Sequence, residues 1–460
     1  MNFLTQVETW ASDAERLALV SDRGQITYAD MITKMQRMSS RLINLGFMRH
    51  NAVGISAGDS IDSLILRLSL MQIGCLPVSL SARLPDEEFE RRRRFANCDH
   101  VVGHVELVDL VLNNLDEEPL YTQYHTRPIA LWAWSGGTSG LADGIFISHD
   151  SIPATANVMT GLGGVVYSAA PMTTSMGLNW IFFTLCRGGT AVIDGRTFMP
   201  LNVEENITRH RVTQFLASPP IYKILMQRNK LDRGDIPVQC IVGGDVCSTQ
   251  LATRWQEWSG RYLYNLFGAS QAGCMFWRVP SDPLGSIGRP FPDMEVELRD
   301  EHGNTVADGE FGEFWTRGPQ RAHSDRSLSG ESSIRDGWIT THDMMMRDRS
   351  GVYWYMGRSN DTFKIDGHRI SPLKIEDQVR EVPGVADVIA VPAQDASGLN
   401  EVRVYVVAEH NDPYELTWIE NAINMKAQVL QNRERPKKVV FVSELPRHPV
   451  TQKLQRYRLR

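Results

Sequence analysis

The sequence predicts an α/β protein: a large N-terminal domain of layered α/β sheets with a β-rich subdomain, followed by a small α+β domain. Three features indicate this organisation. Strand-like and helix-like segments alternate as far as Gly268, which favours layers built around a largely parallel sheet. From about Gly285 the pattern changes to short β-hairpins, and after Gly357 it becomes a compact mixture of helices and strands. Because 460 residues exceed a single compact core, we expect domains at 1–357 and 358–460.

The alternation is clear in the first hundred residues. A strand pair around the turn at Arg23 and Gly24 precedes a helix over 30–45, in which apolar residues recur at helical spacing. The next expected elements are a strand at 51–55, a helix at 61–73, a strand at 76–80 and a helix at 87–97. Four arginines, Arg91 to Arg94, lie in this last helix and could bind phosphates. The acidic residues beside them favour a solvated helix face instead.

A glycine-rich stretch joins two apolar segments, 129–134 and 145–147, and reads as strand, turn and strand. Glycine lets backbone N–H groups turn toward a ligand, and Ser and Thr hydroxyls add further donors, so phosphate is a natural guest. A hairpin that binds nothing is the alternative, and the stretch lacks the lysine of a Walker A loop. The candidate phosphate-binding residues are Ser135, Gly136, Gly137, Thr138, Ser139 and Gly140.

Further strands and helices continue the pattern. We expect helices at 150–158 and 178–185 and strands at 164–168, 190–193, 215–217, 240–245 and 261–268. Ligands of α/β proteins bind at the carboxyl ends of parallel strands. The turns at Gly136 and Gly137, at Gly243 and Gly244, and at Gly268 are therefore expected to line one cleft.

The remaining third of the chain is expected to hold hairpins and then the small domain. Strands are expected at 294–298, 312–316, 344–346 and 352–355, with an exposed polar loop at 322–333. Beyond residue 361 we expect strands at 362–365, 385–391, 401–408 and 439–442, helices at 373–382 and 416–430, and a basic tail.

Composition limits the function classes. The chain is 42% hydrophobic and 22% charged with a net charge of −6, which gives no indication of a nucleic-acid or membrane partner. No secretory signal and no apolar run long enough for a spanning helix is present in the sequence. The six cysteines form no CxxC pair and mostly lie in apolar surroundings, so we expect reduced, buried thiols and a cytoplasmic protein.

Taken in order, several short motifs resemble the adenylate-forming superfamily of acyl- and aryl-CoA synthetases, peptide-synthetase adenylation domains and luciferases. The resemblance covers essentially the whole chain. Besides the glycine-rich stretch, the motifs are Ile26-Thr-Tyr-Ala-Asp30, Gly74-Cys-Leu-Pro77, Tyr264-Asn-Leu-Phe-Gly-Ala-Ser-Gln271, Trp338-Ile-Thr-Thr-His-Asp343, Gly357-Arg358, Lys364-Ile-Asp-Gly367, Arg369-Ile-Ser-Pro-Leu-Lys-Ile-Glu376, and Leu445-Pro-Arg447 with Lys453.

The resemblance implies a fold and a reaction. The C-terminal domain would be a small mobile lid. The carboxylate of an acid would attack the α-phosphate of ATP, with Mg²⁺, to give an acyl-adenylate and pyrophosphate. A thiol of coenzyme A or of phosphopantetheine would then take the acyl group, and rotation of the lid would exchange catalytic groups between the two steps.

The resemblance also implies roles for individual residues. Asp343 would bind the ribose hydroxyls, Arg358 ribose or phosphate, and Lys453 would bridge the carboxylate and the α-phosphate. Asn360 falls at the family's hinge, and Gly367 and His368 fall at its thiol tunnel. Adenine and ribose contacts would come from Gly243, Gly244, Asp245, Asn265, Phe267, Gly268 and Ser270. Candidate residues for the acyl pocket are Thr174, Met176, Asn179, Trp180 and Met275.

Some residues depart from the family pattern. Asp143 lies where the family tends to have a lysine, and Gln271 replaces the glutamate that usually holds Mg²⁺, although an amide is a poorer ligand than a carboxylate. His342 replaces a glycine, and Thr174 stands where many relatives carry an aromatic residue or histidine. Two hypotheses follow: an ATP-dependent acid–thiol ligase, or a degenerate homologue that binds a ligand or serves as a scaffold without turnover.

The substrate and the partners follow from the ligase hypothesis. No acidic residue in the candidate acyl pocket could pair with an α-ammonium group, so we expect a small aliphatic or aryl carboxylic acid. If the acceptor is a carrier protein, it is expected to act in trans. The sequence leaves monomer and homodimer open.

Overall fold

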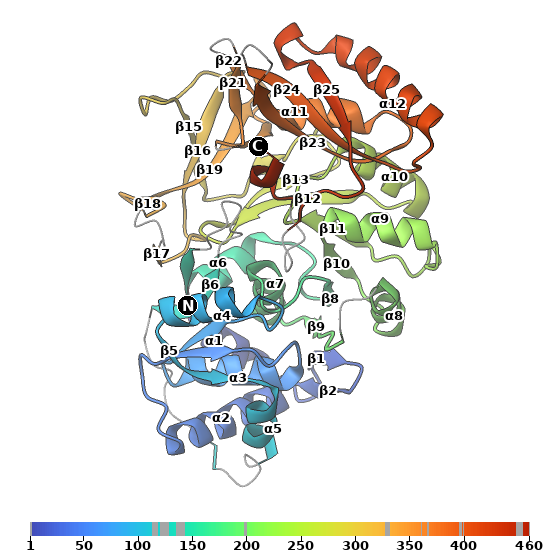
Figure 1. Cartoon of the computed structure of the whole chain (residues 1–460). Coiled ribbons are helices and arrows are strands. Elements are labelled where there is room, and N and C mark those ends of the chain that lie inside the picture. Colours follow the sequence, from blue (N-terminus) through green and yellow to red (C-terminus); the bar gives the residue numbers. More distant parts are fainter. Residues whose placement is uncertain are drawn as a thin grey trace.

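The computed structural model describes residues 2–112, 118–119, 128–134, 143–196, 200–326, 332–359, 361–365, 368–394, 398, 400–447 and 454–459. It confirms the predicted α/β class, with two large layered sheets, a β-subdomain and a small C-terminal domain (Figure 1).

A nine-stranded sheet forms the centre of the large domain. Its order is β14-β13-β12-β11-β10-β8-β9-β1-β2, and the strands from β12 to β1 run parallel. The edge strands β2, β13 and β14 are antiparallel to their neighbours. The strands are β1 (Leu17–Ser21), β2 (Gly24–Thr27), β8 (Val165–Ser168), β9 (Thr190–Val192), β10 (Gln214–Ala217), β11 (Gln239–Gly243), β12 (Leu263–Ala269), β13 (Gly273–Arg278) and β14 (Arg289–Pro290).

A six-stranded sheet forms the second layer, in the order β17-β7-β6-β4-β3-β5. Strands β6 and β7 pair antiparallel, so the two apolar segments that flank the glycine-rich stretch form the predicted strand pair. The strands are β3 (Ala52–Ile55), β4 (Leu76–Ser79), β5 (Cys98–Val102), β6 (Ile129–Trp134), β7 (Gly144–Ser148) and β17 (Ser324–Arg326).

Strand β17 corrects one expectation. The segment 322–333 was predicted to be an exposed loop because it is polar, yet Ser324, Asp325 and Arg326 pair with β7 and Ala322 is only 1% exposed. A short edge strand needs backbone partners more than an apolar pattern, so its side chains gave no signal.

Helices cover both sheets, and one large apolar core and a second smaller one lie against them. Helix α2 shows how the local sequence sets an element: the hydroxyl of Thr27 accepts the N–H of Asp30, and the buried residues recur on one face. The helices are α1 (Phe3–Glu8), η1 (Thr9–Ser12), α2 (Tyr28–Asn44), α3 (Ile61–Gln72), α4 (Asp86–Phe95), α5 (His104–Leu112), α6 (Ser151–Val158), α7 (Ser175–Cys186), α8 (Pro200–Arg209), α9 (Pro219–Arg228) and α10 (Thr249–Ser259).

The arginine run of α4 has partners within its own helix. Arg92 Nε lies 2.7 Å from Glu88 Oε1, and Arg93 Nε lies 3.0 Å from Glu90 Oε2. These pairs agree with the helix face of mixed charge that the sequence favoured.

The β-subdomain is a five-stranded antiparallel sheet in the order β15-β16-β19-β18, with β20 paired to β19. Its strands are β15 (Glu295–Arg299), β16 (Phe311–Arg317), β18 (Ile334–Arg335), β19 (Trp338–Arg347) and β20 (Tyr353–Arg358). The predicted turn at 348–351 joins β19 and β20.

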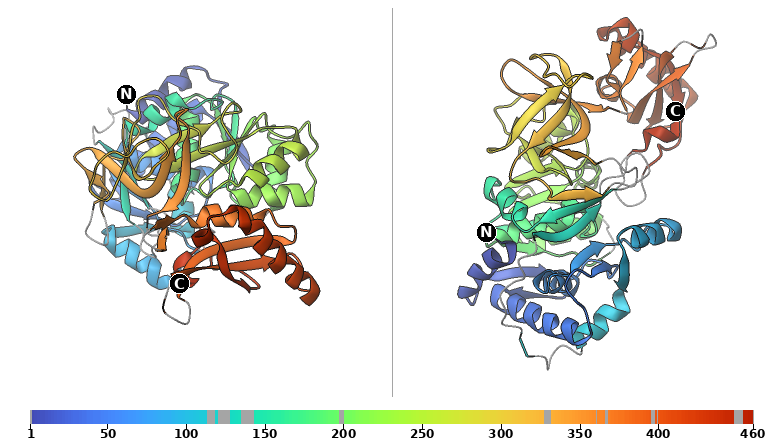
Figure 2. Two further views of the ribbon diagram at one scale, coloured as in Figure 1. Left: turned by 90° about the horizontal axis from the view of Figure 1, so that it is seen from above. Right: turned by 90° about the vertical axis from the view of Figure 1, so that its left-hand side faces the viewer.

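The C-terminal lid domain has its own apolar core beneath a three-stranded sheet, β23-β24-β25. Figure 1 and the right-hand view of Figure 2 place it beside the β-subdomain, at the end of the molecule opposite the N-terminal helices α2 and α5 that Figure 1 labels. The boundary between residues 357 and 358 stays a prediction. The elements are β21 (Phe363–Ile365), β22 (His368–Ile370), α11 (Pro372–Arg380), β23 (Val385–Gln394), β24 (Asn400–Ala408), α12 (Pro413–Lys426), η2 (Ala427–Val429), η3 (Asn432–Glu434), β25 (Pro436–Phe441) and η4 (Arg456–Leu459).

The six cysteines are all buried and none forms a disulfide, as the sequence predicted. Burial raises the pKa of the thiols of Cys98, Cys186, Cys240 and Cys274 to about 12, so they stay protonated. Across the part of the chain that the structure describes, none of the helices has the length and apolar character needed to cross a membrane.

Candidate active site

The strand pair β19–β20 ends in an ion pair between a buried carboxylate and a partly exposed guanidinium. Asp343 and Arg358 lie opposite each other across the strands, and Arg358 Nε is 2.9 Å from Asp343 Oδ1. Two hydroxyl groups also donate to this carboxylate: Thr341 to Oδ2 at 2.5 Å and Tyr355 to Oδ1 at 3.2 Å. The Asp343 carboxylate raises the pKa of Arg358, and burial raises that of Tyr355 well above its usual value. The carboxylate is therefore surrounded by three donor groups, two of which are hydroxyls.

His342 precedes this carboxylate and has a left-handed backbone, with φ of 58°. This conformation favours glycine and explains why a glycine would be preferred here, because a side chain at positive φ is strained. The ring compensates by pairing with Glu313, whose Oε1 lies 2.8 Å from Nδ1. The pair raises the pKa of His342 and lowers that of Glu313.

The ends of three elements of the large domain meet beside the glycine-rich stretch. Ser270, which follows β12, has its Oγ 2.8 Å from Ser175 Oγ and 3.3 Å from the carbonyl oxygen of Trp134, within hydrogen-bonding distance of both. Ser175 is the first residue of α7, and Trp134 is the last residue of β6. The predicted adenine and ribose residue Ser270 thus lies next to the start of the predicted phosphate loop.

The second glycine turn joins the same region. Gly244 has φ of 81°, and a Cβ built on it would lie 3.1 Å from Met176 Sδ. The turn after β11 therefore touches the first turn of α7. Asp245 is exposed and accepts the N–H of Val246 at 2.8 Å.

Two predicted nucleotide contacts also have packing roles. A Cβ on Gly268 would lie 2.7 Å from the carbonyl oxygen of Gly273, so the neighbouring strand alone requires glycine there. Asn265 is buried, and its amide donates to the carbonyl of Ser286 at 3.3 Å. Phe267 lies with its ring centroid 5.4 Å from that of Tyr355, which places it beside the Asp343 carboxylate.

The five acyl-pocket candidates occupy different environments. Thr174 caps α7, since its hydroxyl accepts the N–H of Gly177 at 3.2 Å. Met275 is fully buried in the core of the β-subdomain, and Trp180 is 2% exposed. Met176 faces the Gly244 turn, and the side-chain oxygen of Asn179 has no hydrogen-bond partner within the described residues.

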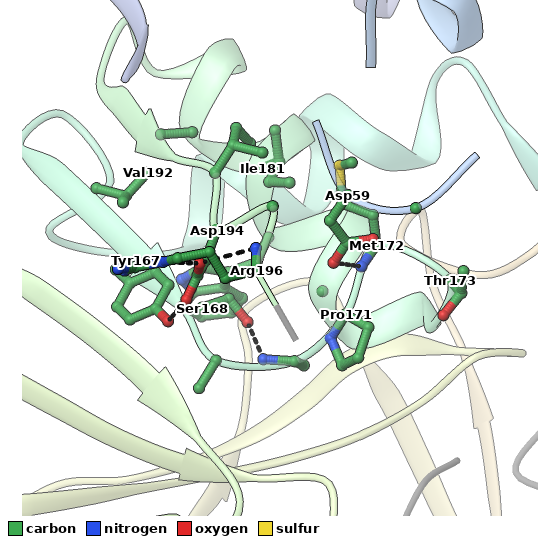
Figure 3. Close-up of a pocket in the computed structure, with 18 of the residues that line it drawn as sticks. Asp59, Tyr167, Ser168, Pro171, Met172, Thr173, Ile181, Val192, Asp194 and Arg196 are labelled. Carbon is green, nitrogen blue, oxygen red and sulfur yellow. Dashed lines mark hydrogen bonds and ion pairs between the residues drawn. The ribbon is translucent and has the colours of Figure 1, made fainter. Parts of the chain in front are cut away.

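A cavity of about 240 Å³ lies where the carboxyl ends of β3, β4, β8 and β9 meet, between the two large sheets. Trp180, Gly177 and Ile181 of α7 form part of its wall. Figure 3 shows Tyr167, Asp194 and Arg196 on one side of the cavity and Asp59 with Met172 on the other.

The polar groups of this cavity differ in how they are held. Asp59 accepts the N–H of Met172 at 2.9 Å, and burial raises the pKa of its carboxyl. Arg196 is bound by Asp194 at 3.1 Å and by Glu205. The side chain of Arg83, by contrast, is exposed and lines the cavity. Its position suits the phosphate of a ligand that enters the cavity.

Several predicted site residues lie outside the described residues: Ser135 to Gly140, Asn360, Gly367 and Lys453. His368 begins β22, and its side chain is not described. Gln271 is described, and its carbonyl oxygen accepts the N–H of Ala322 at 2.7 Å.

Mg²⁺ finds few protein ligands among the described side chains. Within them, no group of three or more His, Cys, Asp or Glu residues could hold a metal ion. Gln271 offers one neutral amide oxygen, whereas Mg²⁺ prefers carboxylate oxygens, phosphates and water. These residues do not fit a protein-built metal cage.

Sequence reasoning missed three contributors, namely Thr341, Tyr355 and Ser175. Thr341 could have been found, because it lies two residues before Asp343 and therefore on the same strand face. Tyr355 depends on an irregular register between Met344 and Met345, which no local pattern reveals.

Comparisons with known proteins agree with this geometry. The AMP-binding enzyme family model matches residues 7–324, and the AMP-binding enzyme C-terminal domain model matches residues 374–451. The chain is 25% identical to the 4-hydroxybenzoate–CoA/benzoate–CoA ligase of Rhodopseudomonas palustris, over 97% of this chain and 90% of that protein. It is 26% identical to the 3-hydroxybenzoate–CoA ligase of Aromatoleum sp., over 97% of this chain and 93% of that protein.

A solved structure shows the same fold. The anthranilate CoA ligase AuaEII, in complex with anthranoyl-AMP, matches with a TM-score of 0.90 at 22% identity, over 100% of this chain and 96% of that chain.

Proposed function

Because the chain belongs to the AMP-binding enzyme family, we propose that it is a ligase that uses ATP to join an aryl carboxylic acid to coenzyme A. A carboxylate oxygen of the acid attacks the α-phosphorus of ATP, and pyrophosphate leaves. The thiol sulfur then attacks the acyl carbonyl carbon of the adenylate, the thiol loses its proton, and AMP leaves. Both steps are acyl or phosphoryl transfers that a protein accelerates by positioning and by stabilising charge.

The Asp343 carboxylate carries this proposal. It is buried, charged and held by Arg358, and it already accepts hydrogen bonds from the hydroxyls of Thr341 and Tyr355. A ribose presents two adjacent hydroxyls, which are the same kind of donor. Asp343 therefore binds the ribose of ATP, with Arg358 on ribose or phosphate and Phe267 against the adenine.

The remaining nucleotide contacts follow from where the described elements end. The N–H groups of the stretch 135–140 bind the phosphates, and that stretch begins directly after Trp134, which Ser270 contacts. Lys453 bridges the acid carboxylate and the α-phosphate, Asn360 is the hinge, and Gly367 with His368 line the thiol path. If Mg²⁺ accompanies the phosphates of ATP, Gln271 would offer it one neutral amide oxygen.

The acid is an aryl carboxylate without an α-amino group. Benzoate and hydroxybenzoate ligases are among the relatives that match nearly the whole chain. Met176 and Trp180 are apolar, and Asn179 carries no charge, so none of them could neutralise a buried ammonium.

The acceptor is coenzyme A, and a carrier protein in trans is the alternative. Arg83 lies exposed at the cavity between the sheets, where a guanidinium can bind a phosphate of the acceptor. Arg83→Gln is expected to raise KM for coenzyme A by about tenfold, the loss of one charge-assisted hydrogen bond, and to leave KM for the acid unchanged. An unchanged KM for coenzyme A would contradict this assignment.

We further propose that the protein acts in the cytoplasm, as its buried, reduced cysteines suggest.

The direct test is adenylate formation. The protein is incubated with ATP, Mg²⁺ and benzoate, 3-hydroxybenzoate, 4-hydroxybenzoate or octanoate, and the adenylate is trapped with hydroxylamine. A hydroxamate with an aryl acid supports the proposal. No hydroxamate with any acid, together with no ATP binding by calorimetry, would reject it in favour of a non-catalytic homologue.

Lys453 is tested separately. Lys453→Ala is expected to abolish hydroxamate formation while ATP still binds. Lys426→Ala is the matched control, because Lys426 lies in the lid helix α12 and pairs with Glu381 at 2.6 Å. Equal activity of the two variants would remove Lys453 from the mechanism.

A further inference from the structure

We propose that Arg456 is a positioning residue, whose ion pair with Glu376 fixes the chain segment that carries Lys453 and ties it to the hinge. The inference rests on the proposed function, in which Lys453 acts during adenylate formation. Arg456 follows Lys453 by three residues and begins η4.

Glu376 is the anchor of this contact. Its side chain is 0% exposed, and four N–H groups donate to its carboxylate. Arg456 binds with both terminal nitrogens: Nη1 contacts Oε1, and Nη2 lies 2.8 Å from Oε2. The N–H of Ala390 donates to Oε1 at 2.8 Å, and Arg380 Nη2 donates to Oε2 at 3.3 Å. The protein's own N–H groups occupy every acceptor position, so we infer that this carboxylate stabilises the domain and does not bind a ligand.

Hydrogen bonds join the described residues on the two sides of 448–453. Leu454 forms a β-bridge with Arg447, and the N–H of Gln455 donates to the carbonyl of Pro446 at 2.8 Å. Arg447 is itself paired with Asp387 at the start of β23. Leu454 and Leu459 pack on Ile389 and Val391 of the same strand. The two ends of the segment that includes Lys453 are thus seated on β23.

Arg456 also reaches the hinge region. Its Nε lies 3.9 Å from Asp361 Oδ2, and Asp361 is the residue after the predicted hinge position Asn360. The N–H of Asp361 donates to the carbonyl of Arg358 at 3.0 Å. One guanidinium therefore connects the tail, the lid core and the residue that leads back to the nucleotide site.

We expect such a contact to restrict the chain that leads from Arg456 back to Lys453. A planar guanidinium binds a carboxylate in a fixed two-point geometry, and a lysine at the same position keeps the charge but not the geometry. A displacement of about 1 Å in a reacting group can cost about 100-fold in rate. Arg456→Lys is therefore expected to displace Lys453 without removing charge from the lid.

The experiment separates the two half-reactions of the full-length protein. Adenylation is measured with benzoate by ATP–pyrophosphate exchange, and thioester formation is measured from synthetic benzoyl-adenylate and coenzyme A. Arg456→Lys is expected to slow adenylation by about 10–100-fold and thioester formation by less than about threefold, because Lys453 acts only in the first step. A purely structural role would slow both, so equal losses, or no loss in adenylation, would overturn the proposal.

Control variants keep the test decisive. Lys374→Met removes another lid ion pair from the same helix, Lys374–Glu434 at 2.8 Å, and is expected to leave both half-reactions unchanged. Glu376→Gln keeps an acceptor for Ala390 and is expected to lose adenylation selectively as well. If Arg456→Lys does not fold, Glu376→Gln is used to compare the two half-reactions in its place.

A readout without substrate separates this inference from the proposed function. Hydrogen exchange of the amides of residues 454–459 is expected to be at least about tenfold faster in Arg456→Lys than in the wild type, with β23 and β24 unchanged. If the wild type activates no acid, the proposed function is rejected. If hydrogen exchange of residues 454–459 is unchanged in Arg456→Lys, the proposed role of Arg456 in holding the tail is rejected instead.

Discussion

Two buried carboxylates, each paired with an arginine, lie before and after the proposed hinge residue Asn360 in the sequence, and they differ in what else binds the carboxylate. Asp343, in the β-subdomain, accepts from one guanidinium and two hydroxyls. Glu376, in the C-terminal domain, accepts from guanidinium groups and a backbone N–H and from no hydroxyl of the described residues. Hydroxyl donors can rotate away or share their acceptor with a ligand, whereas a bidentate guanidinium and a backbone amide cannot.

The comparison teaches how to separate a ligand-binding carboxylate from a structural one of equal burial. Burial and an arginine partner are common to both and carry no information about function. The identity of the remaining donors distinguishes them. The Asp343 pair is therefore expected to affect ATP use, and the Glu376 pair is expected to affect folding and positioning.

Removing the lid arginine should have the largest effect. Arg456→Ala leaves Glu376 charged, fully buried and without its bidentate partner, so the free energy of unfolding is expected to fall by about 3–5 kcal/mol. Urea unfolding measures this loss. A loss below about 1 kcal/mol would show that Glu376 is not held in the manner described.

Removing the charge of Asp343 should reduce ATP use more than stability. Asp343→Asn keeps the size and the acceptor oxygen but loses the charge, so kcat/KM for ATP is expected to fall by about 10–100-fold, the value of a charged hydrogen bond of about 1.5–3 kcal/mol. Steady-state kinetics and calorimetry of ATP binding measure it. A fall in stability as large as that of Arg456→Ala, with unchanged ATP kinetics, would make the two pairs equivalent.

Substitution of Tyr355 tests whether a hydroxyl donor of Asp343 affects ATP binding. Tyr355→Phe removes the hydroxyl that donates to Asp343 at 3.2 Å, a hydrogen bond worth about 1 kcal/mol, and KM for ATP is expected to change by about fivefold. Tyr353→Phe, which removes the hydroxyl of another tyrosine of β20 and leaves that of Tyr355 in place, serves as the comparison. A change in thermal stability without any change in KM would place Tyr355 with the structural donors.

The ion pair of His342 with Glu313, next to Asp343, should have the smallest effect on the free energy of unfolding. His342 is half exposed, so its ion pair with Glu313 is expected to contribute less than about 1 kcal/mol after screening by solvent. The raised pKa of His342 makes this contribution complete below the unfolded pKa of about 6.5 and lost as pH rises through the folded pKa.

Glu313 sets the acid limit of the same contribution. Its lowered pKa makes the contribution complete above the unfolded pKa of about 4.3 and lost as pH falls through the folded pKa. The difference in unfolding free energy between the wild type and His342→Gln should therefore be largest near pH 5–6, by about 1 kcal/mol or less, and vanish at alkaline pH. A difference that is constant with pH would mean that the pair is not ionic.

Much of the architecture could be predicted because it depends on local patterns. The helix at α2, the strand pair β6–β7 and the parallel order of the large sheets follow from apolar spacing, caps and glycine turns. The order of the motifs also indicated Asp343 and Arg358 as candidate site residues, but not that they pair with each other. Strand β17 escaped prediction because a short edge strand depends on its neighbour. The helices α8, α9 and α10 were also missed, although α10 carries a local signal, with the Ser248 hydroxyl as its N-cap and Gly260 at its end.

The sequence by itself determined the fold class, the buried cysteines and the candidate nucleotide residues, since short-range spacing sets helices, strands and turns. Only the tertiary structure decided which of these residues meet. The irregular register of β19 and β20 brings Tyr355 to Asp343, and packing of the lid joins Arg456 to Glu376 across 80 residues. Side chains alternate along a strand, so a shift of one residue would turn Tyr355 to the other face, and no local pattern specifies that register.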